Sequence, residues 1–327
     1  MPSSAERFGW PAFRFLVVLH FCLNYMIVHG DYFSLSAYTA ETLSLPYQPR
    51  ILVAWLLRFL MGFPLLHTLA AHSQGPAIFR DPYELALLLI VIVCMCGTLW
   101  FTRKSLVLLT GNRPFSEWAS LLVILMSWAN LSLGYELWYR VPYDIPSLFF
   151  FSACIYLILS RNFLAFYPVF VLATFNRETS IFLVLFFAIC EWESGLVLML
   201  HLFAQVMLWI ATKAYLRHLF RANGTVMADV HHLKSNLHFL MNPSQWPQLA
   251  SIFAFMLPVI FFGFHWIRDR RIQFAVLSIF PLWFALMMVV GVIIEIRVFN
   301  ELSALSALAV GLILFHRRRA VASTVVE

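Results

Sequence analysis

Charged residues are scarce in this sequence. They make up 12% of the 327 residues, whereas hydrophobic residues make up 62% and the mean hydropathy is +0.82. Soluble globular domains carry about 25% charged residues. The composition therefore excludes an ordinary soluble enzyme and predicts an all-α membrane protein, because helices that cross a bilayer need long, uncharged apolar runs.

The sequence also has none of the short motifs of nucleotide or hydrolytic chemistry. It contains no Walker loop, no dinucleotide-binding glycine pattern, no HExxH and no nucleophile elbow. ATP-driven chemistry is therefore not expected, and a divalent cation is the one cofactor left open. The formal net charge of +6 does not call for a nucleic-acid partner. An excess of Lys and Arg in cytoplasmic loops is what orients a membrane protein.

Cysteine is rare and scattered. All five cysteines lie inside apolar runs, and a helix would point Cys94 and Cys96 to different faces. That spacing suits neither a zinc site nor a redox pair. We expect free, buried thiols and no cysteine-based metal site.

Long apolar runs predict about ten membrane-spanning helices. Eight runs can cross a bilayer core of about 30 Å; they are residues 12–29, 84–102, 117–134, 145–160, 195–215, 249–266, 272–294 and 302–316. Two shorter runs, 163–175 and 179–191, complete the set. Residues 50–71 are apolar but contain Arg50 and Arg58, so we assign them to the membrane interface.

Basic clusters set the predicted orientation. With ten spans, both termini of this single integral membrane domain (residues 1–327) are cytoplasmic, and the clusters at 102–104, 113, 268–271 and 317–319 share that side. The long outer segments 30–83 and 216–248 would carry interfacial helices. A rival count lets 50–71 span and fuses 163–190 into one helix, which puts Arg113 outside.

Acids and arginines recur at the predicted outer ends of the helices. They are Asp31, Arg50, Asp144, Arg177, Glu178, Glu295, Arg297 and Glu301. Ionisable groups near hydrocarbon are costly, and they are usually paired or exposed to a wet cavity. Their gathering on one face therefore predicts a functional site.

The stretch "FNRETSIF", residues 175–182, is expected to be the outward tip of a hairpin of short helices. The run 163–175 spans about 20 Å as a helix, which is short for a bilayer core. The tip should therefore lie in a water-filled recess. We expect Asp144 and Asn176 to be N-caps, and Arg177 to bind an anion beside a helix N-terminus.

The same residues also have purely structural explanations. Arg177 and Glu178 could form an ion pair between helices. Arg297 and Glu301 are four residues apart and could pair on one helix face. The remaining acids and arginines could be caps, turn residues or interfacial side chains.

Four stretches carry a resemblance to a known family. Together they resemble a family of bacterial polytopic membrane proteins over about residues 29–310; they are "PYQPRILVAWLLR", "YDIPSLFFF", "ATFNRETSIFL" and "EIRVFNEL". The most specific part is "NRET" followed downstream by ExRxFxEL. The layout also resembles GT-C glycosyltransferases, with a first helix that ends in an outward acid and a long first outer loop.

The GT-C resemblance implies an enzyme of the bacterial inner membrane that takes sugar from a polyprenyl-phosphate carrier at the outer face. Its partners would be the lipid bilayer and the lipid-linked sugar phosphate, with no nucleic acid and no assigned protein partner. By position, Asp31 would be the catalytic or metal-binding acid, and Arg177 or Arg297 would bind the carrier phosphate. The chain departs from the GT-C pattern in having Asp31 followed by Tyr32 rather than by a second acid.

Glu178 is the second candidate for the general base. The other outer-face residues are expected to contact substrate; they are Arg50, Asp144, Glu295 and Glu301. Two further functions fit the same pattern. One is a transporter or lipid flippase whose path opens at this recess, and the other is a non-catalytic assembly partner of envelope machinery.

Overall fold

Helices dominate the structure. The computed structural model describes residues 4–133, 139–224 and 232–324. Its α-helices are α1 (Ser4–Val28), α2 (Leu35–Thr39), α3 (Leu52–Met61), α4 (Pro64–His72), α5 (Ala77–Arg80), α6 (Pro82–Thr110), α7 (Arg113–Ala119), α8 (Leu122–Ser132), α9 (Asp144–Leu159), α10 (Phe163–Asn176), α11 (Ile181–Cys190), α12 (Gly195–Leu219), α13 (Leu233–Met241), α14 (Trp246–Ala250), α15 (Leu257–Gly263), α16 (Arg270–Val290) and α17 (Leu302–Thr324).

Short 3₁₀ turns and one small sheet connect the helices. The 3₁₀ helices are η1 (Glu178–Ser180), η2 (Trp192–Ser194), η3 (Pro243–Gln245), η4 (Phe264–Trp266) and η5 (Ile296–Phe299). Within the described ranges the only strands are β1 (Gly30–Asp31) and β2 (Tyr139–Arg140), which pair in parallel. The prediction of an all-α chain therefore holds apart from this two-residue pairing.

Several helices are long and apolar enough to cross a membrane. Among the described residues four meet that standard by length and composition; they are Gly9–Val28, Pro82–Thr110, Trp192–Leu219 and Arg270–Val290. A fifth is added if α3 and α4, which are bent by 79° at their junction, count as one span. Of the helices at the other expected positions, α8, α9, α10, α11 and α15 are shorter, and α17 has 23 residues but is not among these candidates. The chain is therefore compatible with a membrane protein.

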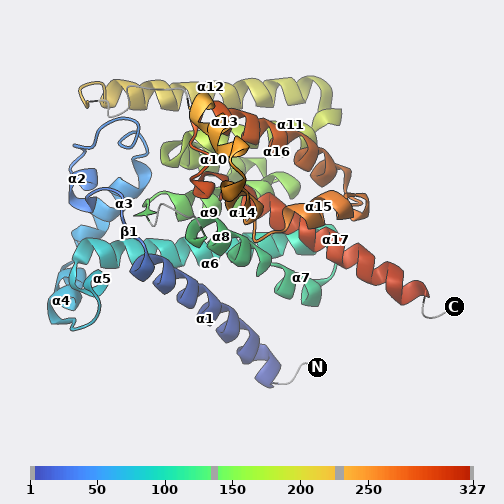
Figure 1. Cartoon of the computed structure of the whole chain (residues 1–327), viewed down its shortest axis with the longest axis horizontal. Coiled ribbons are helices and arrows are strands. Elements are labelled where there is room, and N and C mark those ends of the chain that lie inside the picture. Colours follow the sequence, from blue (N-terminus) through green and yellow to red (C-terminus); the bar gives the residue numbers. More distant parts are fainter. Residues whose placement is uncertain (1–3, 134–138, 225–231, 325–327) are drawn as a thin grey trace.

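Two long helices frame the bundle. α6 and α12 lie on opposite sides of it, with α9, α10 and α11 between them (Figure 1). α9 is apolar on every face, which is typical of a helix that is surrounded by protein. It packs against α6, α10, α11 and α17, and nearly all of its side chains are buried. α12, by contrast, is largely uncovered, and in a bilayer its exposed leucine, methionine and phenylalanine side chains would contact lipid.

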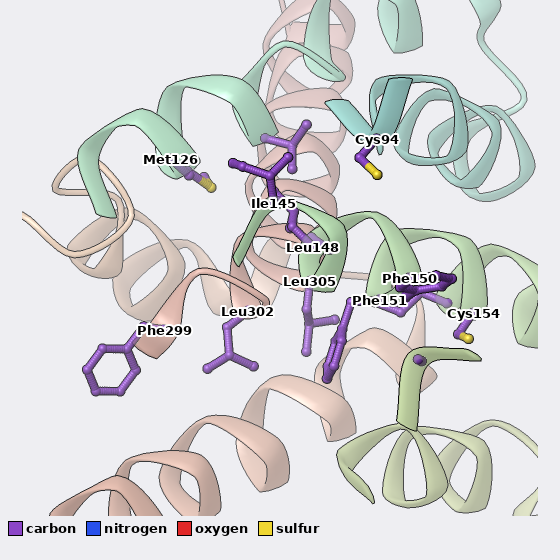
Figure 2. Close-up of a cluster of buried hydrophobic side chains, with 14 of the residues drawn as sticks. Cys94, Met126, Ile145, Leu148, Phe150, Phe151, Cys154, Phe299, Leu302 and Leu305 are labelled. Atoms are coloured by element: carbon purple, nitrogen blue, oxygen red, sulfur yellow. The ribbon is translucent and has the colours of Figure 1, made fainter. Parts of the chain in front are cut away.

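The core lies where α9 meets its neighbours. Figure 2 shows Cys94, Met126, Ile145 and Leu305, which come from α6, α8, α9 and α17, within one cluster of buried hydrophobic side chains. All five cysteines are free, as expected, and four are buried while Cys96 is partly exposed.

The run 249–266 is not the single helix that its apolar composition predicts. α14 ends at Ala250, and three consecutive residues with left-handed backbone, Phe253, Ala254 and Phe255, separate it from α15. The Asn130 side chain of α8 accepts a hydrogen bond from the Phe253 N–H at 2.9 Å. This turn is thus stabilised by Asn130, which lies 123 residues away along the chain. The composition of residues 249–266 alone does not predict it.

The two long segments expected on the outer side meet where the second one begins, just after α12. The segment from Gly30 to α6 folds as α2, α3, α4 and α5, at the left in Figure 1. Asn223, just after α12, donates hydrogen bonds to the carbonyl oxygens of Glu41 (3.0 Å) and Leu43 (2.7 Å). The part of the second segment at 225–231 lies outside the described residues.

Candidate functional site

A buried network of acids and arginines lies where α9, α10 and α17 converge. Arg177, in the link between α10 and η1, reaches Asp144 Oδ1 at 3.2 Å and Glu301 Oε1 at 2.9 Å. The Asp144 and Glu301 side chains are fully buried, and that of Arg177 is 7% exposed. The Thr179 hydroxyl also donates to Glu301 Oε1 at 3.1 Å. Because buried charges are costly unless paired, these contacts hold the three chain segments together.

Arg297 extends the network into η5. Its Nη1 lies 3.2 Å from Asp144 Oδ2, and its Nη2 lies 2.5 Å from Glu295 Oε2. Burial acts to lower the pKa of the Arg297 guanidinium, but the carboxylates of Asp144 and Glu295 outweigh it and raise that pKa above its ordinary value. Arg297 is therefore charged at every physiological pH, and Asp144 serves two arginines through different oxygens.

A second ion pair adjoins this network. Arg50, just before α3, binds both carboxylate oxygens of Glu178, with Nη2–Oε1 at 2.5 Å and Nε–Oε2 at 3.2 Å. Lys213 of α12 lies 3.6 Å from the same carboxylate, and the Trp209 indole donates to the Glu178 carbonyl at 3.1 Å. Both cations favour the ionised form of Glu178.

Tyr143 connects the two parts. Arg50 Nη1 donates to its hydroxyl at 2.5 Å. The ring centre lies 4.6 Å from the Arg50 guanidinium carbon and 5.9 Å from that of Arg177. The buried Tyr143 ring is therefore within cation–π distance of both arginines, and these contacts offset part of the repulsion between the two cations.

Both predicted N-caps are wrong. Asn176 is the last residue of α10, and its amide donates to the Tyr143 carbonyl (3.1 Å) and to the Ser147 hydroxyl (2.8 Å), which fastens α10 to α9. Asp144 is the first residue inside α9, one position after the N-cap residue Tyr143. Its oxygens face Arg177 and Arg297 instead of its own helix, because an arginine offers a charge-assisted bond.

Arg297 and Glu301 do not form the pair that their spacing suggests. Arg297 pairs with Asp144 and Glu295, whereas Glu301 pairs with Arg177. The four-residue spacing assumes one continuous α-helix. In the structure a 3₁₀ turn ends at Phe299 and α17 begins only at Leu302, so the two residues do not share a helix face.

Asp31 belongs to a separate cluster. The β1–β2 pairing sets it beside Arg140, whose Nε lies 2.6 Å from Asp31 Oδ1 and whose Nη2 pairs with Glu84. The link to the main network runs through the next residue. The Tyr32 hydroxyl is 2.8 Å from that of Tyr47, and the Arg297 guanidinium carbon lies 5.9 Å from the Tyr32 ring centre.

A cavity of about 350 Å³ opens beside the network. Its polar lining includes five of the predicted residues, Arg50, Arg177, Glu178, Glu295 and Arg297. Its apolar lining comes mainly from α11, α16 and the segment that follows α16, namely Ile181, Phe182, Leu286, Met287, Val290, Val292 and Val298. Asp144 and Glu301 do not line the cavity, but they pair with Arg177 and Arg297, which do. Asp31 does not line the cavity either. Glu178 is the network's most accessible acid, with 44% of its side chain exposed.

Several buried polar atoms of the network have no hydrogen-bond partner among the described residues. They are Asn176 Oδ1, Arg177 Nε, Arg297 Nε, Glu301 Oε2 and both side-chain amide atoms of Asn300. Buried polar atoms are normally satisfied by protein or by ordered water. Water molecules or a polar ligand are therefore expected in this region.

Sequence reasoning missed Tyr143, Thr179, Trp209 and Lys213. Lys213 carried a usable signal, because it is a lone cation within the apolar run of α12 and such residues mark functional or paired positions. Tyr143 and Trp209 carried none, since aromatic residues are common throughout this chain.

The acids of the site face arginines rather than one another. Across the part of the chain that the structure describes, no three His, Cys, Asp or Glu side chains are grouped closely enough to hold a metal ion. The residues present do not fit a divalent cation, and no chemical step is assigned to one.

Comparison with protein-family models, with curated proteins and with solved structures found no match to this chain. The resemblances described from the sequence therefore remain predictions.

The network predicts a strong dependence of stability on Asp144. Replacing Asp144 by Asn leaves Arg177 and Arg297 without their shared carboxylate, so the free energy of unfolding should fall by about 3–5 kcal/mol. Thermal unfolding of the purified protein in detergent measures the change.

Glu41→Gln is the matched control. Glu41 pairs with Arg58, whose side chain is 52% exposed, and an exposed pair contributes about 1 kcal/mol or less. Equal losses in the two variants would contradict a structural role for the buried network.

Proposed function

We propose that this chain is an integral membrane enzyme resembling GT-C glycosyltransferases, which binds a lipid-linked sugar phosphate in the cavity between Arg50, Arg297 and α16. The observation that carries the proposal is the divided lining of that cavity. Guanidinium groups and carboxylates line one part of it, and most of the remaining lining is made of apolar side chains from α11, α16 and the segment that follows α16. A ligand with a charged headgroup and a hydrocarbon tail matches both kinds of lining.

The arginines supply the phosphate end of this recognition. Arg297 and Arg50 both reach the cavity wall, and a guanidinium can hold two oxygens of one phosphate. Each already contacts a carboxylate, so an incoming phosphate must compete with Glu295 or Glu178 for N–H groups. This competition favours a ligand that brings concentrated negative charge.

The proposed reaction is transfer of the sugar to an acceptor hydroxyl. The acceptor oxygen bonds to the anomeric carbon, and its proton passes to Glu178 or Asp31 as the hydroxyl attacks. The bond between that carbon and the carrier phosphate breaks, and the phosphate leaves with the electron pair. The arginines stabilise the charge that develops on it. That the transferred group is a sugar rests on the resemblance alone.

The membrane arrangement belongs to the same proposal. Ten spans with both termini in the cytoplasm of a bacterial cell would turn the cavity to the outer face of the inner membrane. The carrier lipid would then reach the cavity from the outer leaflet.

Binding can be tested with the carrier lipid alone. Polyprenyl phosphate should raise the melting temperature of the purified protein more than polyprenol, which lacks the phosphate. Arg297→Gln should remove most of that difference, because it deletes a charged donor at the cavity wall. Arg58→Gln serves as the control, since Arg58 pairs with Glu41 and Thr39 and does not line the cavity. Equal shifts with polyprenol and polyprenyl phosphate would refute phosphate recognition.

Turnover measurements distinguish between Glu178 and Asp31 as the general base. With a polyprenyl-phosphate-linked sugar in liposomes, release of free polyprenyl phosphate reports turnover. Glu178→Gln should lower kcat by about 10²-fold or more while lipid binding persists, because general-base catalysis contributes on that scale. Asp31→Asn should lower turnover less, since Asp31 lies outside the cavity and pairs with Arg140. The reverse ranking would assign the base to Asp31.

One observation favours a second candidate, a non-catalytic partner in a membrane assembly. The network balances four cations, Arg50, Arg177, Lys213 and Arg297, against four acids, Asp144, Glu178, Glu295 and Glu301. Full pairing is what a purely structural network requires.

A charge swap distinguishes the two functions. If the network only joins helices, Arg177→Glu combined with Glu301→Arg should recover stability lost in each single variant. If the arginine also acts on substrate, the double variant should refold without recovering turnover. Restored stability and restored transfer in the same double variant would overturn the enzymatic role of Arg177.

A further inference from the structure

A second group of arginines lies away from the cavity, where α1, α6 and α7 meet. Arg14 of α1, Arg103 of α6 and Arg113 of α7 all contact one carboxylate, that of Glu117. Arg103 Nη1 lies 2.6 Å from Glu117 Oε1, and Arg113 Nε lies 3.7 Å from the same oxygen. Figure 1 shows α7 beside the C-terminal end of α6, far from α2 and α3.

This cluster differs from the cavity network in its charge. Three arginines share a single carboxylate, which leaves a net charge of +2 on these four side chains. The side chains of Arg14 and Arg103 are only 16% and 15% exposed, whereas that of Arg113 is 77% exposed, so one of the two unbalanced charges has little access to water. Such a charge calls for a further anion.

Unused hydrogen-bond donors occur at the same place. Trp10 Nε1, Arg14 Nε and Arg103 Nε are buried, and none has a partner among the described residues. Such donors are rarely left unsatisfied in folded proteins. Two charged N–H groups and an indole N–H suit the oxygens of a phosphate group.

The surroundings are those of a membrane interface. The Trp10 and Trp118 rings lie 3.9 Å apart, and Trp118 is exposed together with the apolar side chains of Phe13 and Leu16 on α1. Tryptophan gathers where headgroups meet hydrocarbon. A phosphate held by the arginines would have its acyl chains beside this apolar surface.

We infer that the cluster of Arg14, Arg103 and Arg113 is a binding site for the phosphate of an anionic phospholipid. Basic pockets between membrane helices are known to hold such headgroups. The net charge of +2 disfavours a zwitterionic headgroup, because that headgroup carries its own cation. This site is independent of the proposed enzymatic function, since it uses none of the cavity residues.

Lipid counting tests the inference on the full-length protein. Native mass spectrometry of the detergent-solubilised protein, titrated with phosphatidylglycerol or with phosphatidylcholine, should show preferential retention of phosphatidylglycerol. Arg103→Gln should weaken that retention about fivefold, which corresponds to about 1 kcal/mol per basic residue. Arg113→Gln offers a second test that does not disturb packing, because the Arg113 side chain is 77% exposed.

Two further variants sharpen the result. Glu117→Gln removes the carboxylate that the three arginines share, so it should strengthen phosphatidylglycerol binding if the cluster binds anions. Arg318→Gln, an exposed arginine of α17 outside the cluster, should leave binding unchanged. Inorganic phosphate in the millimolar range is the soluble probe. If inorganic phosphate stabilises the protein against thermal unfolding while both lipids are retained equally, the site binds phosphate, but the phosphate comes from a soluble molecule rather than from a lipid.

Equal retention of both lipids together with no effect of inorganic phosphate would overturn the site. The same conclusion follows if Arg318→Gln weakens binding as much as Arg103→Gln, because the effect would then reflect overall charge.

Discussion

The carboxylate of Asp144 is the contact on which the site depends. It is fully buried at the first turn of α9, and it accepts from Arg177 on one oxygen and from Arg297 on the other. Through Arg177 it is tied to Glu301 at the start of α17. A buried carboxylate cannot exchange these partners for water, so the geometry of all three helix ends is set together.

The apolar helices make that arrangement possible. α9 has no polar face of its own, and its neighbours α6, α10, α11 and α17 cover it on all sides. Charged groups can therefore gather only where these helices end. The uncovered surface of α12 adds an apolar outer face, and the fully buried acids Asp144 and Glu301 lie at helix termini.

Much of this site was predictable from sequence, because apolar runs determine which residues fall at the same ends of helices. That reasoning brought Arg50, Glu178, Glu295 and Arg297 to one place, and the structure sets them around one cavity. It failed where the answer depended on a contact between distant segments. The partners of Asn176 lie 29 and 33 residues away, so its capping role could not be judged locally.

Other failures have the same origin. Asp31 is separated from the cavity because its strand pairs in parallel with residues 139–140. The sequence around Asp31 contains no pattern that predicts this pairing. The break within residues 249–266 depends on Asn130 in α8. Span count and orientation likewise depend on a bilayer and stay predictions of the sequence.

The equal numbers of cations and acids around the cavity have a consequence for how a ligand arrives. An electroneutral group of charges produces little field beyond its immediate contacts, so it cannot attract an anion from a distance. The ligand must instead reach the cavity by diffusing within the plane of the membrane. The association rate should then vary little with ionic strength, even though the bound headgroup is charged.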